Sequence, residues 1–203
     1  MAKIKICGLS RDCDIDYVNE AAADFAGFVF AESRRKVSVS EAEKLRKRLC
    51  RGIVPVGVFV NAPQELICSL YNAGIIAAAQ LHGKEDAVYR TELKKRCAIQ
   101  IIQAVAPHEF ALGANCYDDA DYLLVDGSAG SGKAFDRSLI EGAAKNCGNS
   151  YVAWFLAGGI TTENIFDALE MHPFGIDVSS GAETDGVKDR KKILALTEAV
   201  KRC

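Results

Sequence analysis

Short apolar runs alternate along the chain with longer segments in which apolar and charged residues recur at helical spacing. The apolar runs are nearly continuous, as in strands that are buried on both faces of a parallel sheet. The strands predicted from these runs cover residues 3–6, 25–30, 54–60, 77–81, 99–105, 122–125, 152–157 and 174–178.

The segments between these runs predict helices. Their ranges are 12–23, 40–49, 63–72, 86–95, 107–112, 136–144, 162–171 and 189–201. The last of them places apolar residues along one face and lysines elsewhere, which is typical of an amphipathic helix. The candidate N-caps are Ser40, ahead of the second helix, and Thr161 or Thr162, ahead of the seventh.

Strand and helix alternate in eight units at an interval of about 25 residues, and no linker or shift in composition divides them. Eight units predict an α/β fold of the TIM type, a single closed (β/α)₈ barrel that spans residues 1–203. The chain is short for that fold, which implies trimmed loops. An open doubly wound sheet is the alternative, but it usually has fewer strands.

Composition narrows the class of protein further. Apolar residues make up 49% of the chain, which is enough for a core, and the formal net charge of −2 argues against nucleic acid or an anionic membrane as a partner. The 8 cysteines include no Cys-x-x-Cys pair of the kind found in metal ribbons. There is no signal-peptide core and no apolar stretch long enough for a bilayer, so we expect a cytoplasmic protein with free thiols.

In a barrel of this kind the active site lies at the carboxyl ends of the strands. Reactive or small residues follow most of the predicted strands, and we expect them to meet on one rim. They are Cys7, Ser33-Arg34-Arg35, Asn61, His82, Asp126, Gly158-Gly159 and Ser179-Ser180-Gly181.

The last two of these turns predict a phosphate site, because the loops after strands seven and eight commonly hold phosphate in barrels. Gly158 and Gly159 form one turn, and Ser179, Ser180 and Gly181 form the other. Tight turns without a ligand are the plainer interpretation. The loop over 127–134 nearly matches a P-loop, but Ala134 replaces the metal-binding hydroxyl residue, and a lid over the rim is the alternative.

The remaining rim residues allow acid–base chemistry. Asp126 is a candidate general acid whose pKa burial would raise, and Cys7 is a candidate thiolate base that needs a modest reduction of its pKa. Arg34 or Arg35 could clamp a carboxylate, and His82 could donate a hydrogen bond at the rim. Each could equally be an ordinary structural or surface residue.

Eight short segments, in order from residue 3 to about residue 190, together form a recognisable pattern. They are Lys5-Ile6-Cys7-Gly8, Gly27-Phe28-Val29-Phe30, Ser33-x-Arg35, Val56-Gly57-Val58-Phe59-Val60-Asn61, Gln80-Leu81-His82-Gly83, Gly130-Ser131-Gly132-Lys133-x-Phe135-Asp136, Leu156-Ala157-Gly158-Gly159 and Asp177-Val178-Ser179-Ser180-Gly181-x-Glu183. With these segments the chain resembles the phosphoribosylanthranilate isomerase family of tryptophan biosynthesis.

The resemblance implies an isomerase that converts N-(5-phosphoribosyl)anthranilate to 1-(2-carboxyphenylamino)-1-deoxyribulose 5-phosphate without metal or cofactor. It implies that Asp126 protonates the ribose ring oxygen and that Cys7 removes the proton from C2 of the sugar. Arg35 would hold the anthranilate carboxylate, and His82 and Asp177 would border the sugar. The backbone at Gly158, Gly159, Ser179, Ser180 and Gly181 would hold the phosphate.

Two other functions remain as alternatives. A related histidine-pathway or bifunctional isomerase would carry an aspartate where this chain has Cys7. A non-catalytic barrel that binds a sugar phosphate would not need a thiol opposed to a carboxyl group. The chain departs from the family pattern at Lys36, Ala134 and Arg137, which concerns the lid and affinity and not the acid and base. The resemblance implies a small phosphosugar as the partner, and we expect the protein to be a monomer or a homodimer.

Overall fold

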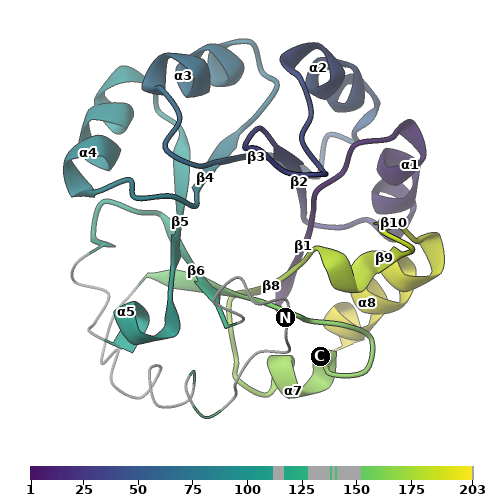
Figure 1. Cartoon of the computed structure of the whole chain (residues 1–203). Helices are drawn as coiled ribbons and strands as arrows, with labels where there is room; N and C mark the ends of the chain where they lie inside the picture. The colour runs from purple at the N-terminus through teal and green to yellow at the C-terminus, as the bar shows by residue number, and fades with distance from the viewer. Residues whose placement is uncertain (112–116, 128–137, 139, 141–151, 203) are drawn as a thin grey trace.

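A computed structural model describes residues 1–111, 117–127, 138, 140 and 152–202. Eight parallel strands form a closed barrel in which each strand pairs with its neighbours in the chain and β8 pairs with β1 (Figure 1). The strands are β1 (Lys3–Cys7), β2 (Phe25–Val29), β3 (Val54–Phe59), β4 (Ala78–Leu81), β5 (Gln100–Val105), β6 (Tyr122–Asp126), β7 (Ala153–Ala157) and β8 (Gly175–Val178). The barrel prediction is confirmed, and the open doubly wound sheet is excluded.

The helices lie around the outside of the strand ring (Figure 1). They are α1 (Asp12–Ala21), α2 (Val39–Arg48), α3 (Gln64–Asn72), α4 (Ala87–Arg96), α5 (Pro107–Ala111), α7 (Ile165–Leu169) and α8 (Arg190–Arg202). The helix predicted over 136–144 falls on residues outside those described, apart from two positions. None of the described helices combines the length and the apolar character needed to cross a membrane.

Two helices are capped by residues other than those predicted. Ser38 and not Ser40 caps α2, where its hydroxyl accepts from the Glu41 amide at 3.2 Å and the Glu41 carboxylate accepts from the Ser38 amide at 2.7 Å. The cap of α7 is Asn164, and its Oδ1 accepts from the amide of Thr161. Both predicted caps were short polar residues near the true start, and tertiary packing selected a different one.

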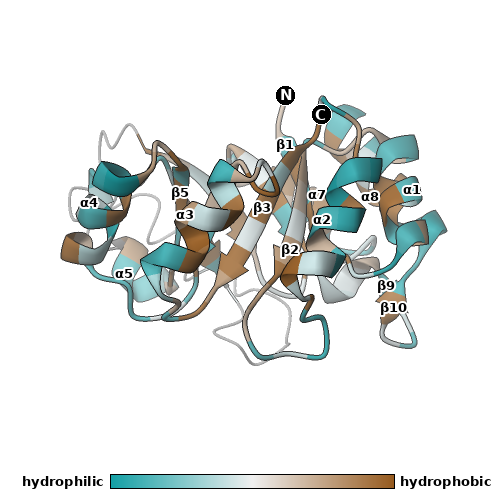
Figure 2. Cartoon of the chain, turned by 90° about the horizontal axis from the view of Figure 1, so that it is seen from above, coloured by the Kyte–Doolittle hydropathy of each residue, from teal (hydrophilic) through white to brown (hydrophobic). Residues whose placement is uncertain are grey.

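The core has two layers. Seven buried side chains fill the inside of the barrel: Phe25, Val56, Ala78, Ile102, Leu124, Phe155 and Ala157. A larger cluster packs between the outside of the strands and the helices, and Figure 2 shows brown strands inside helices with teal outer faces. Helices therefore cover the outer face of the sheet while side chains fill its inner face, which explains why the strand sequences are apolar almost throughout.

A small two-stranded unit beyond β8 was not predicted. A 3₁₀ turn, η2 (Ser180–Ala182), leads into β9 (Glu183–Thr184), which pairs antiparallel with β10 (Val187–Lys188). Asp185 and Gly186 connect them and both have positive φ, as tight hairpins require. The register places Glu183 opposite Lys188 at the carboxyl end of the barrel.

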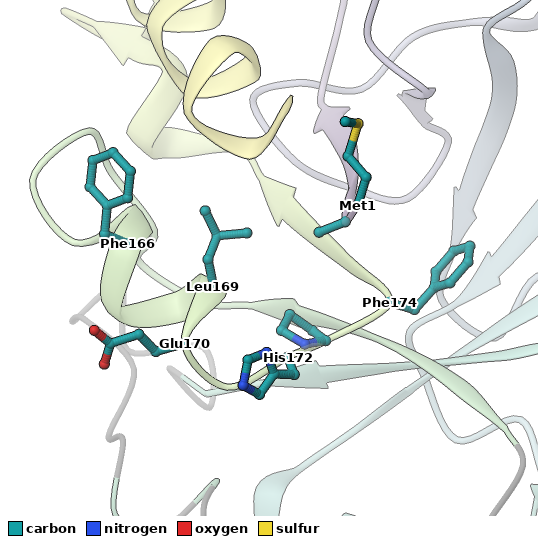
Figure 3. Close-up of a pocket in the computed structure, with 8 residues that line it drawn as sticks. Met1, Phe166, Leu169, Glu170, His172 and Phe174 are labelled. Carbon is teal, nitrogen blue, oxygen red and sulfur yellow. The ribbon is translucent and has the colours of Figure 1, made fainter. Parts of the chain in front are cut away.

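A cavity of about 580 Å³ lies at the opposite, amino-terminal end of the barrel. Figure 3 shows Met1 and Phe174, which precede β1 and β8, facing Phe166 and Leu169 of α7 across it. Because barrel enzymes place their chemistry at the carboxyl ends of the strands, we do not assign the active site to this cavity.

Candidate active site

A cavity of about 260 Å³ opens at the carboxyl ends of the strands. Most of the rim residues predicted from the sequence line it, so the expected convergence on one rim is found for them, whereas Arg34, Asn61 and Gly181 do not line it. The lining residues are Cys7, Val29, Ser33, Arg35, Val58, Gln80, His82, Asp126, Ala157, Gly158, Gly159, Asp177, Ser179 and Ser180. The loop expected to act as a lid falls almost wholly on 128–137, outside the described residues.

Asp126 ends β6 with its carboxylate partly open to the cavity, since 23% of the side chain is exposed. His82 follows β4, and its Nε2 lies 3.8 Å from Asp126 Oδ2. Both residues also border a second cavity of about 320 Å³, which continues toward Val105 and Glu109. Asp126 therefore lies between two cavities and lines both, within reach of a ligand that occupies either.

Cys7 ends β1 with its side chain buried in the wall of the cavity, and only 7% of the residue is exposed. Gly27 on the neighbouring strand makes room for it, because a Cβ at residue 27 would lie 2.9 Å from Cys7 Sγ. Burial raises the pKa of the Cys7 thiol, while the nearby ammonium groups of Lys5 and Lys188 oppose that rise. The lowered pKa that a thiolate base would need is therefore not found at Cys7, because loss of water outweighs the two cations.

Arg35 and Arg34 are separated by their surroundings. Arg35 lines the cavity with 22% of its side chain exposed, whereas Arg34 lies outside the lining and is 57% exposed. Arg35 donates from Nε to Glu183 Oε1 at 2.6 Å and from Nη2 to Oε2 at 3.0 Å. Arg34 donates to the same carboxylate from its outer side. Glu183 thus fixes Arg35 at the rim of the cavity, and the role of Arg35 in binding a carboxylate stays a prediction.

Glu183 and Lys188 form a buried pair behind this rim that sequence reasoning missed as a site feature. Lys188 Nζ lies 2.7 Å from Glu183 Oε1 and donates to the carbonyl of Ser179 at 2.9 Å. The pKa of Glu183 is lowered, because hydrogen bonds from Arg35 and Lys188 outweigh the effect of burial. Glu183 stands in the last segment of the family resemblance, but only the hairpin brings Lys188 to it.

The two turns expected to bind phosphate lie against each other. Gly158 and Gly159 both have positive φ, a conformation that side chains other than glycine rarely adopt. Gly181 does not line the cavity. A Cβ on it would lie 1.8 Å from the carbonyl oxygen of Ile160, so its role in the structure is to let the turn after β8 approach the turn after β7.

Gln80 is a further cavity residue, noted in the sequence only as part of a resembling segment. Its Nε2 lies 2.9 Å from His82 Nδ1, and its Oε1 is buried without a hydrogen-bond partner among the described residues. A buried acceptor at a cavity wall is costly unless a ligand or water satisfies it. In the described part of the chain no group of three or more His, Cys, Asp or Glu side chains is arranged to hold a metal ion.

These groups make one kind of chemistry accessible. A thiol from β1 and a carboxyl group from β6, strands that are not neighbours in the barrel, line the same small cavity. An arginine at the rim and a glycine-rich pair of turns offer binding places for two separate anionic groups. The arrangement suits a molecule that carries an anion at each end and exchanges protons at its centre.

Comparison with known proteins agrees with this geometry. The family described as N-(5'phosphoribosyl)anthranilate (PRA) isomerase matches residues 4–199. The N-(5'-phosphoribosyl)anthranilate isomerase of Endomicrobium trichonymphae is 41% identical over 200 residues and 96% of both chains. A phosphoribosyl anthranilate isomerase solved with reduced 1-(o-carboxyphenylamino)-1-deoxyribulose 5-phosphate is 31% identical, with a TM-score of 0.84 over 100% of both chains. Monomers derived from the dimeric enzyme of Thermotoga maritima are 30% identical, with a TM-score of 0.83 over 100% of both chains.

Proposed function

Because the chain belongs to the phosphoribosylanthranilate isomerase family, we propose that Cys7 and Asp126 are the general base and the general acid of its reaction. The enzyme isomerises N-(5'-phosphoribosyl)anthranilate to 1-(2-carboxyphenylamino)-1-deoxyribulose 5-phosphate in tryptophan biosynthesis. The reaction is an Amadori rearrangement, an internal redox change in which C1 of the sugar is reduced and C2 is oxidised. It needs one proton delivered to oxygen and one removed from carbon.

Ring opening is the step assigned to Asp126. The carboxylic acid gives its proton to the ribose ring oxygen, the bond between C1 and that oxygen breaks, and the nitrogen lone pair forms a C1=N iminium. The partly open position of Asp126 at the junction of two cavities supports this role, because the acid must touch a ligand atom.

Removal of the C2 proton is the step assigned to Cys7. The thiolate takes the proton, the C2–H electron pair forms a C1=C2 bond, and the iminium electrons return to nitrogen to give an enolamine. The positive iminium acidifies C2 enough for a thiolate to act as base. The enolamine then gains a proton at C1 and loses one from the C2 hydroxyl, which restores the thiolate of Cys7 and the acid form of Asp126.

Two anchors would place the sugar between acid and base. Arg35 would hold the anthranilate carboxylate, since Glu183 fixes the orientation of its guanidinium. The paired turns at Gly158-Gly159 and Ser179-Ser180 would hold the phosphate, and His82 and Asp177 would border the sugar hydroxyls. Anchoring both ends of the substrate raises the rate, because C1 and C2 of the sugar are then held close to both the acid and the base.

The observation that carries the proposal is that Cys7 and Asp126 line one cavity although 119 positions separate them in the chain. We expect Cys7→Ser and Asp126→Asn each to lower kcat by a factor of about 10² to 10⁴, with binding of a product analogue retained. The loss of anthranilate fluorescence measures turnover. Cys50→Ser, an exposed thiol far from the cavity, is the matched control. Near-normal turnover in both variants would remove the assignment.

A histidine-pathway or bifunctional activity is the second candidate considered from the sequence. The thiol at residue 7 and the family assignment both favour the tryptophan-pathway reaction. Assaying the purified protein with the aminoaldose phosphate substrate of each pathway separates the two, and we expect turnover with the anthranilate compound alone.

We further propose that residues 1–203 form one catalytic domain and that the enzyme works in the cytoplasm, where reducing conditions keep a thiol base available. A monomer and a homodimer remain the two candidate assemblies, and the dimeric Thermotoga maritima relative is a precedent for the second. Light scattering on the purified protein distinguishes them.

A further inference from the structure

A lysine lies wholly inside the barrel directly below the active-site cavity. Lys5 occupies the middle of β1, and none of its surface is exposed. Side chains two residues apart on a strand share a face, so Lys5 and Cys7 both point to the barrel interior. Few proteins bury a lysine completely without giving it a charged partner.

Lys5 has a charged partner across the seam between β1 and β8 and a thiol beside it on its own strand. Its Nζ lies 2.8 Å from Asp177 Oδ1, and the strand register places Lys5 directly beside Asp177. Cys7 lies two residues further along the same face of β1, and the positive charge of Lys5 opposes the rise in the pKa of its thiol. The carboxylate, the ammonium and the thiol therefore lie together on the inner side of this seam.

Stability alone does not account for this arrangement. Taking two charges out of water costs several kcal/mol per ion, and apolar side chains of similar size often replace buried ion pairs at no cost. The neighbouring interior positions are filled by Phe25 and Phe155, which shows that the barrel accepts large apolar groups there. The position of the pair against the sulfur of Cys7 instead points to an electrostatic role in the reaction.

We propose that Lys5 is a positioning residue for the catalytic base: held by Asp177, its ammonium donates a hydrogen bond to Cys7 Sγ and stabilises the thiolate that removes the C2 proton. This inference rests on the proposed function and adds to it the group that makes the thiol usable as a base. It also gives Asp177 a task besides bordering the sugar, because the carboxylate keeps the ammonium in place.

The charges around Cys7 support this role. Burial raises the pKa of the thiol, and among the groups that oppose this rise Lys5 acts most strongly. Asp177 on β8 raises the pKa, and Lys188 on β10 lowers it. Arg35 on the loop after β2 is a further cation near the sulfur. Asp126 and His82 border the same cavity from β6 and β4.

Lys5 differs from the other two cations in its position relative to the sulfur. Lys188 lies 2.7 Å from Glu183, and Arg35 is bound through Nε and Nη2 to the same carboxylate. Lys5 instead pairs with Asp177 on the inner face of β1 that it shares with Cys7, and its charge acts on the thiol more strongly than that of Lys188. A hydrogen bond from a cation to the charged form of an acid favours that form directly.

The test is the pH dependence of Cys7 alkylation by iodoacetamide in Lys5→Met, followed by mass spectrometry of the peptide that contains Cys7. We expect the alkylation midpoint to move up by about one pH unit or more, since a neighbouring cation lowers an acid's pKa by about that amount. The matched control is Lys3→Met. Lys3 lies on the same strand, but its ammonium pairs with Asp24 and its side chain is 47% exposed. The control midpoint should not move.

Lys5→Met leaves Asp177 buried without its cation and could unfold the protein, so a second variant is needed as a control for misfolding. The double variant Lys5→Met/Asp177→Asn removes both charges, and we expect its Cys7 midpoint to be raised as well. In the single variant kcat/KM should fall at least about tenfold at pH 7, recover partly at higher pH, and leave affinity for a product analogue unchanged.

The outcomes separate this inference from the proposed function. An unshifted midpoint in both variants overturns the inference while the role of Cys7 stands, provided that Cys7→Ser is inactive. A shifted midpoint without any change in the pH profile of kcat/KM overturns the role of Cys7 as base, and the catalytic role of Lys5 with it. A shift in both measurements, absent from Lys3→Met, supports the proposal.

Discussion

Replacing Arg35 by alanine tests how the enzyme holds the carboxylate of its substrate. Arg35 donates through Nε and Nη2 to Glu183. Among the described residues its Nη1 has no hydrogen-bond partner, so this nitrogen can donate to a ligand in the cavity. Arg35→Ala removes this charged donor from the rim. The loss should fall on substrate binding and positioning and leave the acid and the base in place.

The magnitude follows from one charge-assisted hydrogen bond. Such a bond contributes about 1.5–3 kcal/mol, which corresponds to a decrease in kcat/KM of about 10- to 150-fold. The matched control is Arg34→Ala, because Arg34 pairs with the same carboxylate but is 57% exposed and lies outside the cavity lining. An exposed ion pair contributes about 0–1 kcal/mol, so kcat/KM of the control should fall by less than about fivefold.

The assay is the decay of anthranilate fluorescence at several substrate concentrations, which gives kcat and KM separately. Denaturant unfolding of each variant shows whether loss of the contact to Glu183 changes the folded fraction. If Arg34→Ala lowers kcat/KM as much as Arg35→Ala does, or more, the carboxylate binds elsewhere and the assignment of Arg35 is wrong.

Three further predictions follow from the same geometry. We expect kcat/KM to rise with pH through the neutral range, because the thiolate of Cys7 is the active form and burial raises its pKa; a pH–rate profile that is flat from about pH 6 to about pH 9 contradicts this. Gly181→Ala should lower the unfolding free energy by about 1–3 kcal/mol, because the new Cβ would lie 1.8 Å from the carbonyl oxygen of Ile160. The same change should weaken binding of a phosphorylated product analogue. The control Gly52→Ala should have neither effect, because no atom lies within 4 Å of its Cβ. Glu183→Gln should destabilise the protein by about 3–5 kcal/mol at neutral pH, because a buried lysine loses its carboxylate. The pKa of Glu183 is lower in the folded state than in the unfolded state, so its carboxylate stabilises the fold above the unfolded pKa of about 4.3, and this stabilisation is lost as the pH falls through the folded-state pKa. The difference in unfolding free energy between Glu183→Gln and the parent protein, measured with urea, should therefore shrink in acid. A difference that stays constant refutes the assignment.

Local sequence pattern was sufficient to predict the strands of the barrel. A strand buried on both faces must be apolar throughout, so the run over 122–125 identified β6 and also placed Asp126 at its carboxyl end. The carboxyl ends of parallel strands meet at one rim of the barrel, so the sequence alone predicted that Cys7, His82 and Asp126 would lie together. Helix starts were less accurate, because several short polar residues near α2 could each have served as its cap.

The groups behind the rim could not be found in this way. Lys188 reaches Glu183 only because β9 and β10 form a hairpin, and its sequence resembles an ordinary surface segment. The same holds for the direction of the pKa shift at Cys7. A thiol's burial and its neighbouring charges depend on the packing of several strands, and no local pattern encodes them.

The sequence by itself determined the eight strands of the barrel and the residues at the strand ends, because both follow from side-chain periodicity within a few positions. The tertiary structure alone decided what Lys5 does. A lysine in a strand usually points to water, and its partner Asp177 lies 172 residues away. Only closure of the barrel between β1 and β8 sets the register that buries the two charges together beneath Cys7.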